Sequence, residues 1–355
     1  MSIKSFVFSG NDYEIGFQQG QSNREAIQKG LEVIFNLDLV KRSKPKLVTK
    51  SLFVMLAKRR ADKLLRKDLF SLHPKHAERI RGIAEGAEVD VSSVLFIQML
   101  ELVIAGCTSL GFLPTATSTG ETILAKNFDY ANFVEPYNLV CETQPSKGYK
   151  TLCCRFVSLS GALDAMNEHG LAMTYNLARS TDKPQCNVPT SVILQEMLET
   201  CKNTQEGVDF LTKAKTGGHD GIIALADAAD NIKVVELSRQ HVEVREPESD
   251  MVINTNHYQT PEMKSVEKVP LYPSSQPRFE RAKDLLGNKR NIDEKLIKTA
   301  LRDHGTENAP SNITICMHGE EFGTMRSMIM YPKRRLMKVL FGHPCENEYQ
   351  EIRFS

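Results

Sequence analysis

The stretch Gly106–Phe112, which reads GCTSLGF, decides the fold of this chain. It follows the apolar run Val94–Ala105 and precedes a second β-rich run, Thr122–Tyr130, which reads TILAKNFDY. A small residue before a cysteine, then a strand, a turn and a second strand ending in Asn-x-Asp, suggests an enzyme that cuts its own chain and then acts on amide bonds. We therefore expect cleavage of the peptide bond between Gly106 and Cys107.

The thiol of Cys107 is the expected nucleophile. Thiolate is the reactive form and a free cysteine is mostly thiol near neutral pH, so the residue needs a base. Cleavage after Gly106 would give Cys107 a free α-amine, whose pKa of about 7.7–8.0 allows it to accept the thiol proton. The alternative is a core thiol at a helix-to-strand junction, and the tripeptide Gly106–Thr108 by itself favours that alternative.

Length and composition are those of a globular protein with a large core. The 355 residues would permit two domains or one large α/β domain, and 41% of them are hydrophobic and 25% charged. A net charge of +1 gives no general attraction to nucleic acid or to a membrane. No stretch is long and apolar enough to span a bilayer, and Met1–Gly10 lacks the apolar core of a signal peptide. We therefore expect a cytoplasmic protein.

The eight cysteines are expected to be mostly reduced and buried, as in other cytosolic proteins. No pair has Cys-x-x-Cys spacing. The adjacent residues Cys153 and Cys154 would point to opposite faces of a strand, which makes them a poor metal site. Cysteine spacing therefore gives no sign of a metal site.

Helical and β-rich segments occur in separate blocks. The first third reads as helical, with Pro74 suited to a first helical position and Asp90 able to cap a helix over Val91–Ile104. From Cys107 onward, short β runs alternate with turn signals and with helical pairs near 190–214 and 276–301. A further strand is expected at Asn312–Cys316. Strands in blocks and helices in blocks predict stacked layers.

The region Lys41–Lys67 is basic and contains a single acid, Asp62. This pattern favours the solvated face of a peripheral helix. The alternative is a docking patch for anionic ligands, such as the phosphates of coenzyme A or a lipid surface.

Polar residues at the ends of later β runs are the candidate partners of Cys107. A hairpin that returns beside Cys107 would bring Asp129 near the new amine, although Asn127 and Asp129 could instead serve only turn hydrogen bonds. Asn176 ends another run and could face the site. Asn256 can donate to a developing oxyanion, which is worth roughly 3 kcal/mol in acyl-transfer enzymes.

Arginine and histidine residues are further candidates for the site, each with a structural alternative. Arg278 and Arg281 have helical spacing and could clamp a carboxylate or orient an aspartate, or could be surface charge. His257 could form a Cys/His pair with Cys107, although a single histidine is more often a satisfied polar residue. Asn167 fits a tight hairpin turn and is read as structural.

Together these segments resemble the N-terminal-nucleophile hydrolases of the acyl-coenzyme A:6-aminopenicillanic acid acyltransferase type, peptidase family C45. They are also similar to penicillin V acylases and bile salt hydrolases. The resemblance covers nearly the whole chain: Tyr13–Gly20 resembles the opening helix, Ile83–Ala87 the pre-cleavage region and Gly106–Ser109 the cleavage site. The stretch Asn167–Met173 resembles the family's Asn-Glu-x-Gly-Leu turn.

The resemblance also covers the candidate residues. Lys126–Asp129 matches a strand in which the hydrolase relatives carry Arg and Asp; the Asp is retained, but Lys126 replaces the Arg, which puts an Arg-specific substrate contact in doubt. Asn176 falls at the polar position after the turn, Asn256 at the oxyanion Asn, and Arg278 in the Arg-Phe segment that supplies an active-site Arg.

The resemblance implies an α+β protein with a four-layer αββα fold and a helical N-terminal segment. It implies one domain over 1–355, cut into a mostly helical small chain (1–106) and a catalytic large chain (107–355) that remain associated. It implies no metal and no cofactor, with a coenzyme A thioester as a possible substrate. The implied catalytic residues are Cys107, Asp129, Asn256 and Arg278, and the implied substrate-binding residues are Lys126, Asn127 and Asn176.

The expected activity is transfer of an acyl group from an amide or thioester onto Cys107 and then to water or an amine. A different class, a non-catalytic relative that stays uncut and acts as a binding protein, remains an alternative. A thiol peptidase that pairs Cys107 with His257 in an uncut chain is the least expected.

Overall fold

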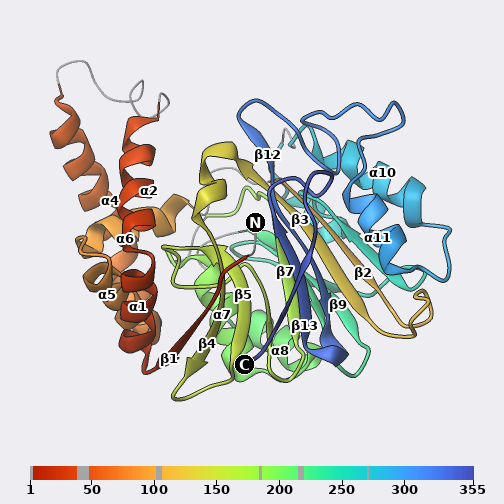
Figure 1. The fold of residues 1–355 in the computed structure, drawn as a ribbon, viewed down its shortest axis with the longest axis horizontal. Coiled ribbons are helices and arrows are strands. Elements are labelled where there is room, and N and C mark those ends of the chain that lie inside the picture. The colour runs from red at the N-terminus through yellow and green to blue at the C-terminus, as the bar shows by residue number, and fades with distance from the viewer. Residues whose placement is uncertain (1–2, 38–47, 101–105, 184–185, 215–219, 270–271) are drawn as a thin grey trace.

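Two β-sheets packed face to face form the centre of the computed structural model (Figure 1), which describes residues 3–37, 48–100, 106–183, 186–214, 220–269 and 272–355. The larger sheet has the order β1-β4-β5-β6-β7-β8-β9-β10. Its strands are β1 (Ser5–Gly10), β4 (Asn138–Pro145), β5 (Thr151–Phe156), β6 (Asp164–Asn167), β7 (Ala172–Leu177), β8 (Gly221–Ala226), β9 (Ile232–Leu237) and β10 (Val242–Arg245).

The smaller sheet carries the Cys107 segment near its middle, in the order β11-β2-β3-β12-β13-β14. Its strands are β11 (Met251–Asn254), β2 (Gly106–Phe112), β3 (Ile123–Ala131), β12 (Phe322–Tyr331), β13 (Leu336–Phe341) and β14 (Gln350–Arg353). All of its strand pairs are antiparallel.

Helices cover the outer faces of both sheets. In Figure 1 the N-terminal helices form the red and orange bundle on the left, and α10 and α11 lie on the right beside β2 and β3. The helices are α1 (Asp12–Ser22), α2 (Arg24–Asn36), α4 (Lys50–Leu72), α5 (Pro74–Gly86), α6 (Val91–Leu100), α7 (Thr190–Thr200), α8 (Thr204–Lys213), α9 (Pro261–Ser265), α10 (Ser275–Leu286) and α11 (Glu294–Leu301).

Three apolar clusters fill the spaces between the layers, because side chains of a strand alternate between its two faces. One joins α7, α8 and the N-terminal helices to the larger sheet, with Met173 and Leu194 among its members. The second, including Leu124 and Met166, lies between the sheets. The third, including Leu110 and Leu286, joins the smaller sheet to α10 and α11. The protein is therefore a four-layer αββα structure, as expected.

Glycines bring α1 and α5 into backbone contact. A Cβ added at Gly16 would lie 2.1 Å from the carbonyl oxygen of Arg79, and one added at Gly82 would lie 2.2 Å from that of Tyr13. Only a residue without a side chain allows this approach. A capping box between Asn11 and Glu14 begins α1.

The N-terminal segment is also tied to the larger sheet. Strand β1 lies at the edge of this sheet and pairs in parallel with β4, and its Phe8 is buried. The guanidinium of Arg79, in α5, is buried and bonds Asp12 of α1 and Glu199 of α7, each at 2.8 Å. The side-chain nitrogen of Gln19 donates to the carbonyl of Val157 at 2.8 Å.

Near the start of α11, Glu294 has several cationic and hydroxyl partners. Burial alone would raise its pKa, but hydrogen bonds from Lys298, Tyr331 and Lys338 outweigh burial and hold the pKa at about 2. These contacts fix α11 to the smaller sheet.

Several predicted elements differ in the structure. The strand expected at Asn312–Cys316 is instead a loop of turns and bends, because its residues are held by local hydrogen bonds such as Thr314 Oγ1 to the Ser311 carbonyl, 2.9 Å. Strands β1 and β14 were not predicted. The helix expected over Val91–Ile104 is described as α6 to Leu100, and residues 101–105 lie outside the described residues.

The basic region Lys41–Lys67 contributes most of α4; residues 41–47 lie outside the described residues. Two of its cations have acidic partners on the surface: Lys58 bonds Asp90 and Arg66 bonds Asp62. No helix in the described ranges is both long enough and apolar enough to cross a bilayer.

Candidate active site

Cys107 lies at the start of β2, where this strand meets the end of β3. In the antiparallel register Gly106 is opposite Asp129 and Cys107 is opposite Phe128. Paired residues share a face of the sheet, so Cys107 and Phe128 face one way and Gly106 and Asp129 the other. The hairpin therefore brings Asp129 beside the expected cleavage site.

The backbone of Cys107 is held at both of its polar groups. Its N–H donates to Asn256 Oδ1 at 2.9 Å. Its carbonyl accepts from Arg278 Nη1 and, at 3.5 Å, from the side-chain nitrogen of Asn176. Three of the predicted partners thus converge on this one residue from three separate segments.

The amide of Asn256 has a defined orientation, because each of its atoms meets a partner of the opposite type. Oδ1 accepts from the Cys107 N–H and from Arg278 Nη2 (2.7 Å), and Nδ2 donates to the Leu177 carbonyl at 2.8 Å. An amide nitrogen carries two hydrogens, so one donor of Nδ2 is not used by the Leu177 bond.

Arg278 is fully buried in the first part of α10, which packs against β2 and β11. Nη1 also donates to Thr108 Oγ1 at 2.9 Å, and the guanidinium lies 3.9 Å from Asp129 Oδ2. Burial lowers the pKa of Arg278, while the nearby carboxylate acts against that effect. Arg281, one turn further along, leaves the site and pairs with Asp303 at 2.7 Å.

Asp129 is buried, and among the described residues only one of its two carboxylate oxygens has a hydrogen-bond partner. Oδ1 accepts from Thr324 Oγ1 at 2.7 Å, whereas Oδ2 has no hydrogen-bond partner among the described residues. A Cβ added at Gly106 would lie 2.9 Å from Oδ2, so the unpaired oxygen is adjacent to the Gly106 backbone. Burial raises the pKa of Asp129, and Arg278 acts in the opposite direction.

The thiol side of Cys107 faces a cavity of about 210 Å³. Its walls are aromatic and aliphatic side chains from α2, α6, β3, β5 and β7, and none of the lining residues in the described part of the chain is charged. Phe128, Tyr130 and Phe156 form an aromatic cluster at this wall, with ring centroids 5.7–5.8 Å apart. Burial raises the pKa of the Cys107 thiol, so the thiolate does not form without a base.

Lys126 is buried and binds a carboxylate. Its Nζ donates to Asp164 Oδ1 at 2.6 Å and to the Tyr175 carbonyl. The other oxygen of Asp164 accepts from Arg326 Nη2 at 3.1 Å, and the Arg326 guanidinium lies 3.9 Å from the centre of the Phe128 ring. Lys126 therefore lies beneath the cavity wall and is one of two cations that share one carboxylate.

The structure places the Asn127 side chain on the face of β3 opposite to the Cys107 cavity. Its side-chain nitrogen donates to the carbonyls of Leu301 and Ile315, at 2.8 and 2.9 Å, on the outer face of the smaller sheet. Strand alternation points Asn127 away from the Cys107 cavity, and its amide joins the sheet to the layer outside it, so a contact with substrate in this cavity stays a prediction that the placement does not support.

Asn176 and His257 border the Cys107 segment in different ways. Asn176 donates to the carbonyls of Asn254 and Thr255 at 3.1 and 2.9 Å, which fixes the chain just before Asn256. His257 Nδ1 contacts the hydroxyls of Ser275 (2.8 Å) and Thr255 (3.1 Å), and burial lowers its pKa. In the described part of the chain no hydrogen bond joins His257 to Cys107.

Thr324, Asp164 and Arg326 are site residues that sequence reasoning missed. Each reaches the site only through the pairing of distant segments: Thr324 is opposite Asp129 across β12 and β3, and Asp164 comes from the other sheet. The signal that the sequence did offer was Lys126 within the β-rich run Thr122–Tyr130. A lysine buried in such a run requires an anionic partner elsewhere in the fold, although the sequence does not say which one.

An apolar cavity that ends at a buried thiol, with amide and guanidinium groups around the adjacent backbone, suits the handling of acyl groups. The family model of acyl-coenzyme A:6-aminopenicillanic acid acyl-transferase matches residues 116–346, and the chain belongs to this family. The matched range contains Asp129, Asn176, Asn256 and Arg278 and begins after Cys107.

Solved structures of such enzymes are similar to this chain. A Caenorhabditis elegans ortholog of N-acylethanolamine-hydrolyzing acid amidase is 18% identical, over 64% of this chain and 93% of that one, with a TM-score of 0.47. A variant of conjugated bile acid hydrolase from Clostridium perfringens is 13% identical, over 70% and 97%, with a TM-score of 0.45. Penicillin V acylase from Agrobacterium tumefaciens is 16% identical, over 66% and 83%, with a TM-score of 0.45.

Proposed function

We propose that this protein is a self-cleaving cysteine amidohydrolase or acyltransferase whose nucleophile is Cys107. The observation that carries the proposal is the arrangement at the start of β2, where Cys107 and Gly106 face opposite sides of the smaller sheet. The Cys107 thiol meets an apolar cavity on one face, and on the other face Asp129 Oδ2, which has no hydrogen bond among the described residues, lies beside Gly106.

The proposed maturation step is an N-to-S acyl shift. The thiol sulfur attacks the Gly106 carbonyl carbon, the Gly106–Cys107 C–N bond breaks, and the Cys107 nitrogen takes a proton to become an amine. Water then hydrolyses the thioester, which gives the Gly106 carboxylate and restores the thiol. Small chain 1–106 and large chain 107–355 are the proposed products.

After the cut, the new α-amine is the proposed base. It keeps Asn256 Oδ1 as an acceptor, which already binds this nitrogen at 2.9 Å. Asp129 Oδ2 supplies a second acceptor that has no other hydrogen bond among the described residues. Because burial raises the pKa of the thiol, an adjacent amine with a pKa near neutrality is needed to form the thiolate.

Asn256, Arg278 and Asn176 are proposed to support the acyl step. Asn256 Nδ2 has one donor beyond its bond to Leu177, which we assign to the oxyanion of the tetrahedral intermediate. Arg278 positions Asn256 and the Cys107 carbonyl, and Asn176 fixes the segment that carries Asn256. Lys126, expected to contact substrate, acts in this proposal through Asp164 beneath the wall.

The proposed substrate is a small molecule with an apolar acyl group, because the cavity at Cys107 has no charged lining residue in the described ranges. Its polar end would be an amide or a thioester, and the acceptor water or an amine. Hydrolysis of a linear amide is the simpler version. A coenzyme A thioester is the alternative donor, supported only by the basic residues of α4. Eight free cysteines fit the reducing cytoplasm in which we place the enzyme.

Intact mass under denaturing conditions tests the nucleophile. We expect two fragments that meet at Gly106 and Cys107, one uncut chain for Cys107→Ala, and normal cutting for the matched control Cys186→Ala. A single full-length chain in all three proteins would remove the amine base from the mechanism and favour the binding-protein alternative.

Product analysis then separates hydrolase from transferase. The cut protein is incubated with amides and thioesters of apolar acyl groups, with and without an added amine. Diversion of product from free acid to a new amide indicates a transferase, and unchanged acid formation indicates a hydrolase. No turnover by a fully cut protein across both donor classes would contradict the enzymatic proposal.

A further inference from the structure

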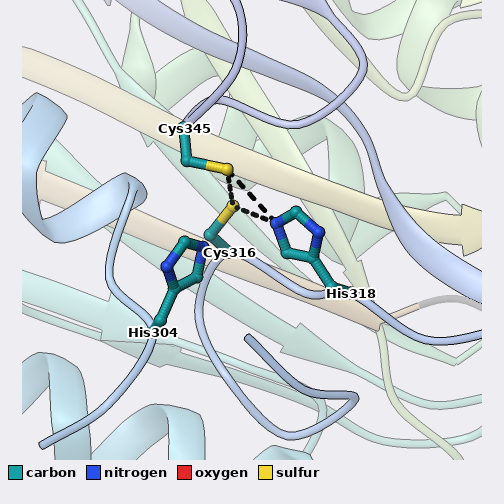
Figure 2. A group of neighbouring side chains, drawn as sticks. All are labelled: His304, Cys316, His318 and Cys345. Carbon is teal, nitrogen blue, oxygen red and sulfur yellow. Dashed lines mark hydrogen bonds between the residues drawn. The ribbon is translucent and has the colours of Figure 1, made fainter. Parts of the chain in front are cut away.

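Four metal-ligating side chains meet at the end of the smaller sheet, apart from Cys107. They are His304, Cys316, His318 and Cys345, and one ligand atom of each lies within 4.8 Å of the others (Figure 2). They come from the turn after α11, from the loop before β12 and from the turn after β13. The chain therefore brings them together only in the folded state.

The ligand atoms of this cluster are about as far apart as the ligands of one tetrahedral metal ion. Cys316 Sγ lies 3.4 Å from His318 Nε2 and 3.5 Å from Cys345 Sγ, and His318 Nε2 lies 3.2 Å from Cys345 Sγ. Tetrahedral zinc with bonds of about 2.3 Å to sulfur and 2.0 Å to nitrogen separates its ligands by roughly 3.5–3.8 Å. The three distances among Cys316, His318 and Cys345 are shorter than this by at most a few tenths of an ångström, and the His304 ring nitrogen lies within 4.8 Å of all three ligand atoms.

The cluster leaves its own polar atoms poorly satisfied. His304 Nε2 is buried and has no hydrogen-bond partner among the described residues. The two thiols and the His318 nitrogen can satisfy one another only weakly, because thiols are poor donors and poor acceptors. A cation at the centre would give all four groups a strong partner.

We propose that His304, Cys316, His318 and Cys345 form a tetrahedral zinc site. Two thiolates and two neutral imidazoles balance the charge of Zn²⁺, and this soft donor set selects zinc over magnesium or calcium. Cys345 lies at the surface and gives the ion a route of entry. The His318 ring stacks on His343 with centroids 3.8 Å apart, which fixes the plane of one ligand.

The zinc would cross-link the loop beside the candidate active site. Between Cys316 and His318, the Met317 N–H donates to Thr324 Oγ1 at 2.9 Å, and that hydroxyl donates to Asp129 Oδ1 at 2.7 Å. The Met317 methyl would lie 3.4 Å from a Cβ at Gly106. A zinc ion bound by Cys316 and His318 would thus fix the loop that contacts Gly106 and, through Thr324, Asp129. The zinc site does not depend on the proposed function.

The spacing of cysteines and histidines in the sequence did not reveal this site. The proposed zinc site also differs from the expectation, stated in the sequence analysis, that the protein binds no metal. Cys316 and His318 are separated by one residue, while His304 and Cys345 lie on other segments. The search for Cys-x-x-Cys pairs could not detect a ligand set assembled from three turns.

The first test is metal content of the full chain, purified under reducing conditions without a polyhistidine tag or chelator. Inductively coupled plasma mass spectrometry should find about one zinc ion per chain. Cys316→Ser should lower this to less than roughly a fifth, whereas Cys186→Ser, a cysteine outside the cluster, should keep it. Wild-type protein that binds no zinc even after addition of an equimolar amount would overturn the proposal.

Cobalt provides a readout that does not depend on a variant folding. Wild-type protein stripped of metal and given Co²⁺ should show thiolate-to-cobalt charge-transfer absorption and the intense visible bands of tetrahedral cobalt. Weak octahedral bands without charge transfer would refute thiolate ligation. A thiol count under denaturing conditions, made on the same protein, should find eight thiols. A count two short would indicate a Cys316–Cys345 disulfide in place of the metal.

Discussion

Replacing Asp164 by asparagine should destabilise the protein far more than removing either of the cations it binds. Asp164, Lys126 and Arg326 all have fully buried side chains, and the carboxylate lies 2.6 Å from Lys126 Nζ and 3.1 Å from Arg326 Nη2. At an effective dielectric constant near 20, each of these pairs is worth roughly 5–6 kcal/mol of Coulomb energy before desolvation. Asp164→Asn keeps the shape and leaves two buried cations without a counter-charge.

The expected losses in the free energy of unfolding depend on how many buried charges each variant leaves without a partner. Leaving a buried charge uncompensated costs about 3–5 kcal/mol, so we expect about 4 kcal/mol or more for Asp164→Asn. Lys126→Met leaves a one-to-one pair of Asp164 and Arg326 and should cost only about 1–2 kcal/mol. The double variant combines Asp164→Asn with Lys126→Met and so lacks one of the two buried cations that would repel each other. This double variant should be roughly 2 kcal/mol more stable than Asp164→Asn alone.

Urea unfolding is the assay, followed by far-UV circular dichroism because the chain has no tryptophan. All variants are made in a Cys107→Ala background, so that a cut in the chain cannot change the transition. The reasoning is refuted if Asp164→Asn lies within about 1 kcal/mol of its parent, or if adding Lys126→Met makes it less stable still.

Three further outcomes are expected. Gly82→Ala places a Cβ 2.2 Å from a backbone oxygen of α1 and should cost about 3 kcal/mol, whereas Gly30→Ala, whose Cβ has 3.5 Å of clearance, should be neutral or stabilising by urea unfolding. Glu294→Gln should cost about 1 kcal/mol at pH 7 after solvent screening. Because the folded pKa of Glu294, about 2, lies below its ordinary 4.5, this gap should close as pH falls from 4.5 to 2, and a gap that is constant with pH would contradict it. His257→Ala should still be cut and keep its activity, as intact mass and product analysis would show; an uncut but active wild-type chain whose activity is lost in a folded His257→Ala variant would support the Cys/His alternative.

Local sequence pattern predicted much of the fold. Pro74 begins α5 and Asp90 caps α6 as expected, because both signals act through backbone groups of the next few residues. The strand expected at Asn312–Cys316 failed for a reason that pattern does not contain. Its apolar residues Ile313 and Ile315 alternate as in a strand, but the segment has turns stabilised by side chains and no neighbouring strand to pair with in the described ranges.

The candidate site was predictable in part. The family resemblance, carried by the order and spacing of several short motifs, named Cys107, Asp129, Asn256 and Arg278, which the structure brings together. Strand alternation alone could have separated Asn127 from Lys126, since neighbours on a strand face opposite ways. The partners Asp164 and Thr324 could not be found, because contacts between segments 38 and 195 residues apart leave no periodic signal.

The edge position of β1 bears on how a cut protein would refold. Residues Ser5–Gly10 belong to the proposed small chain, yet they complete a sheet made by the large chain and bury Phe8 there. A cut at Gly106 would therefore leave the native shape and its interior unchanged. Once unfolded, however, the two pieces must find each other by diffusion, so recovery would become second order in protein concentration. Folding first and cutting afterwards would make the native state easy to reach once and slow to regain.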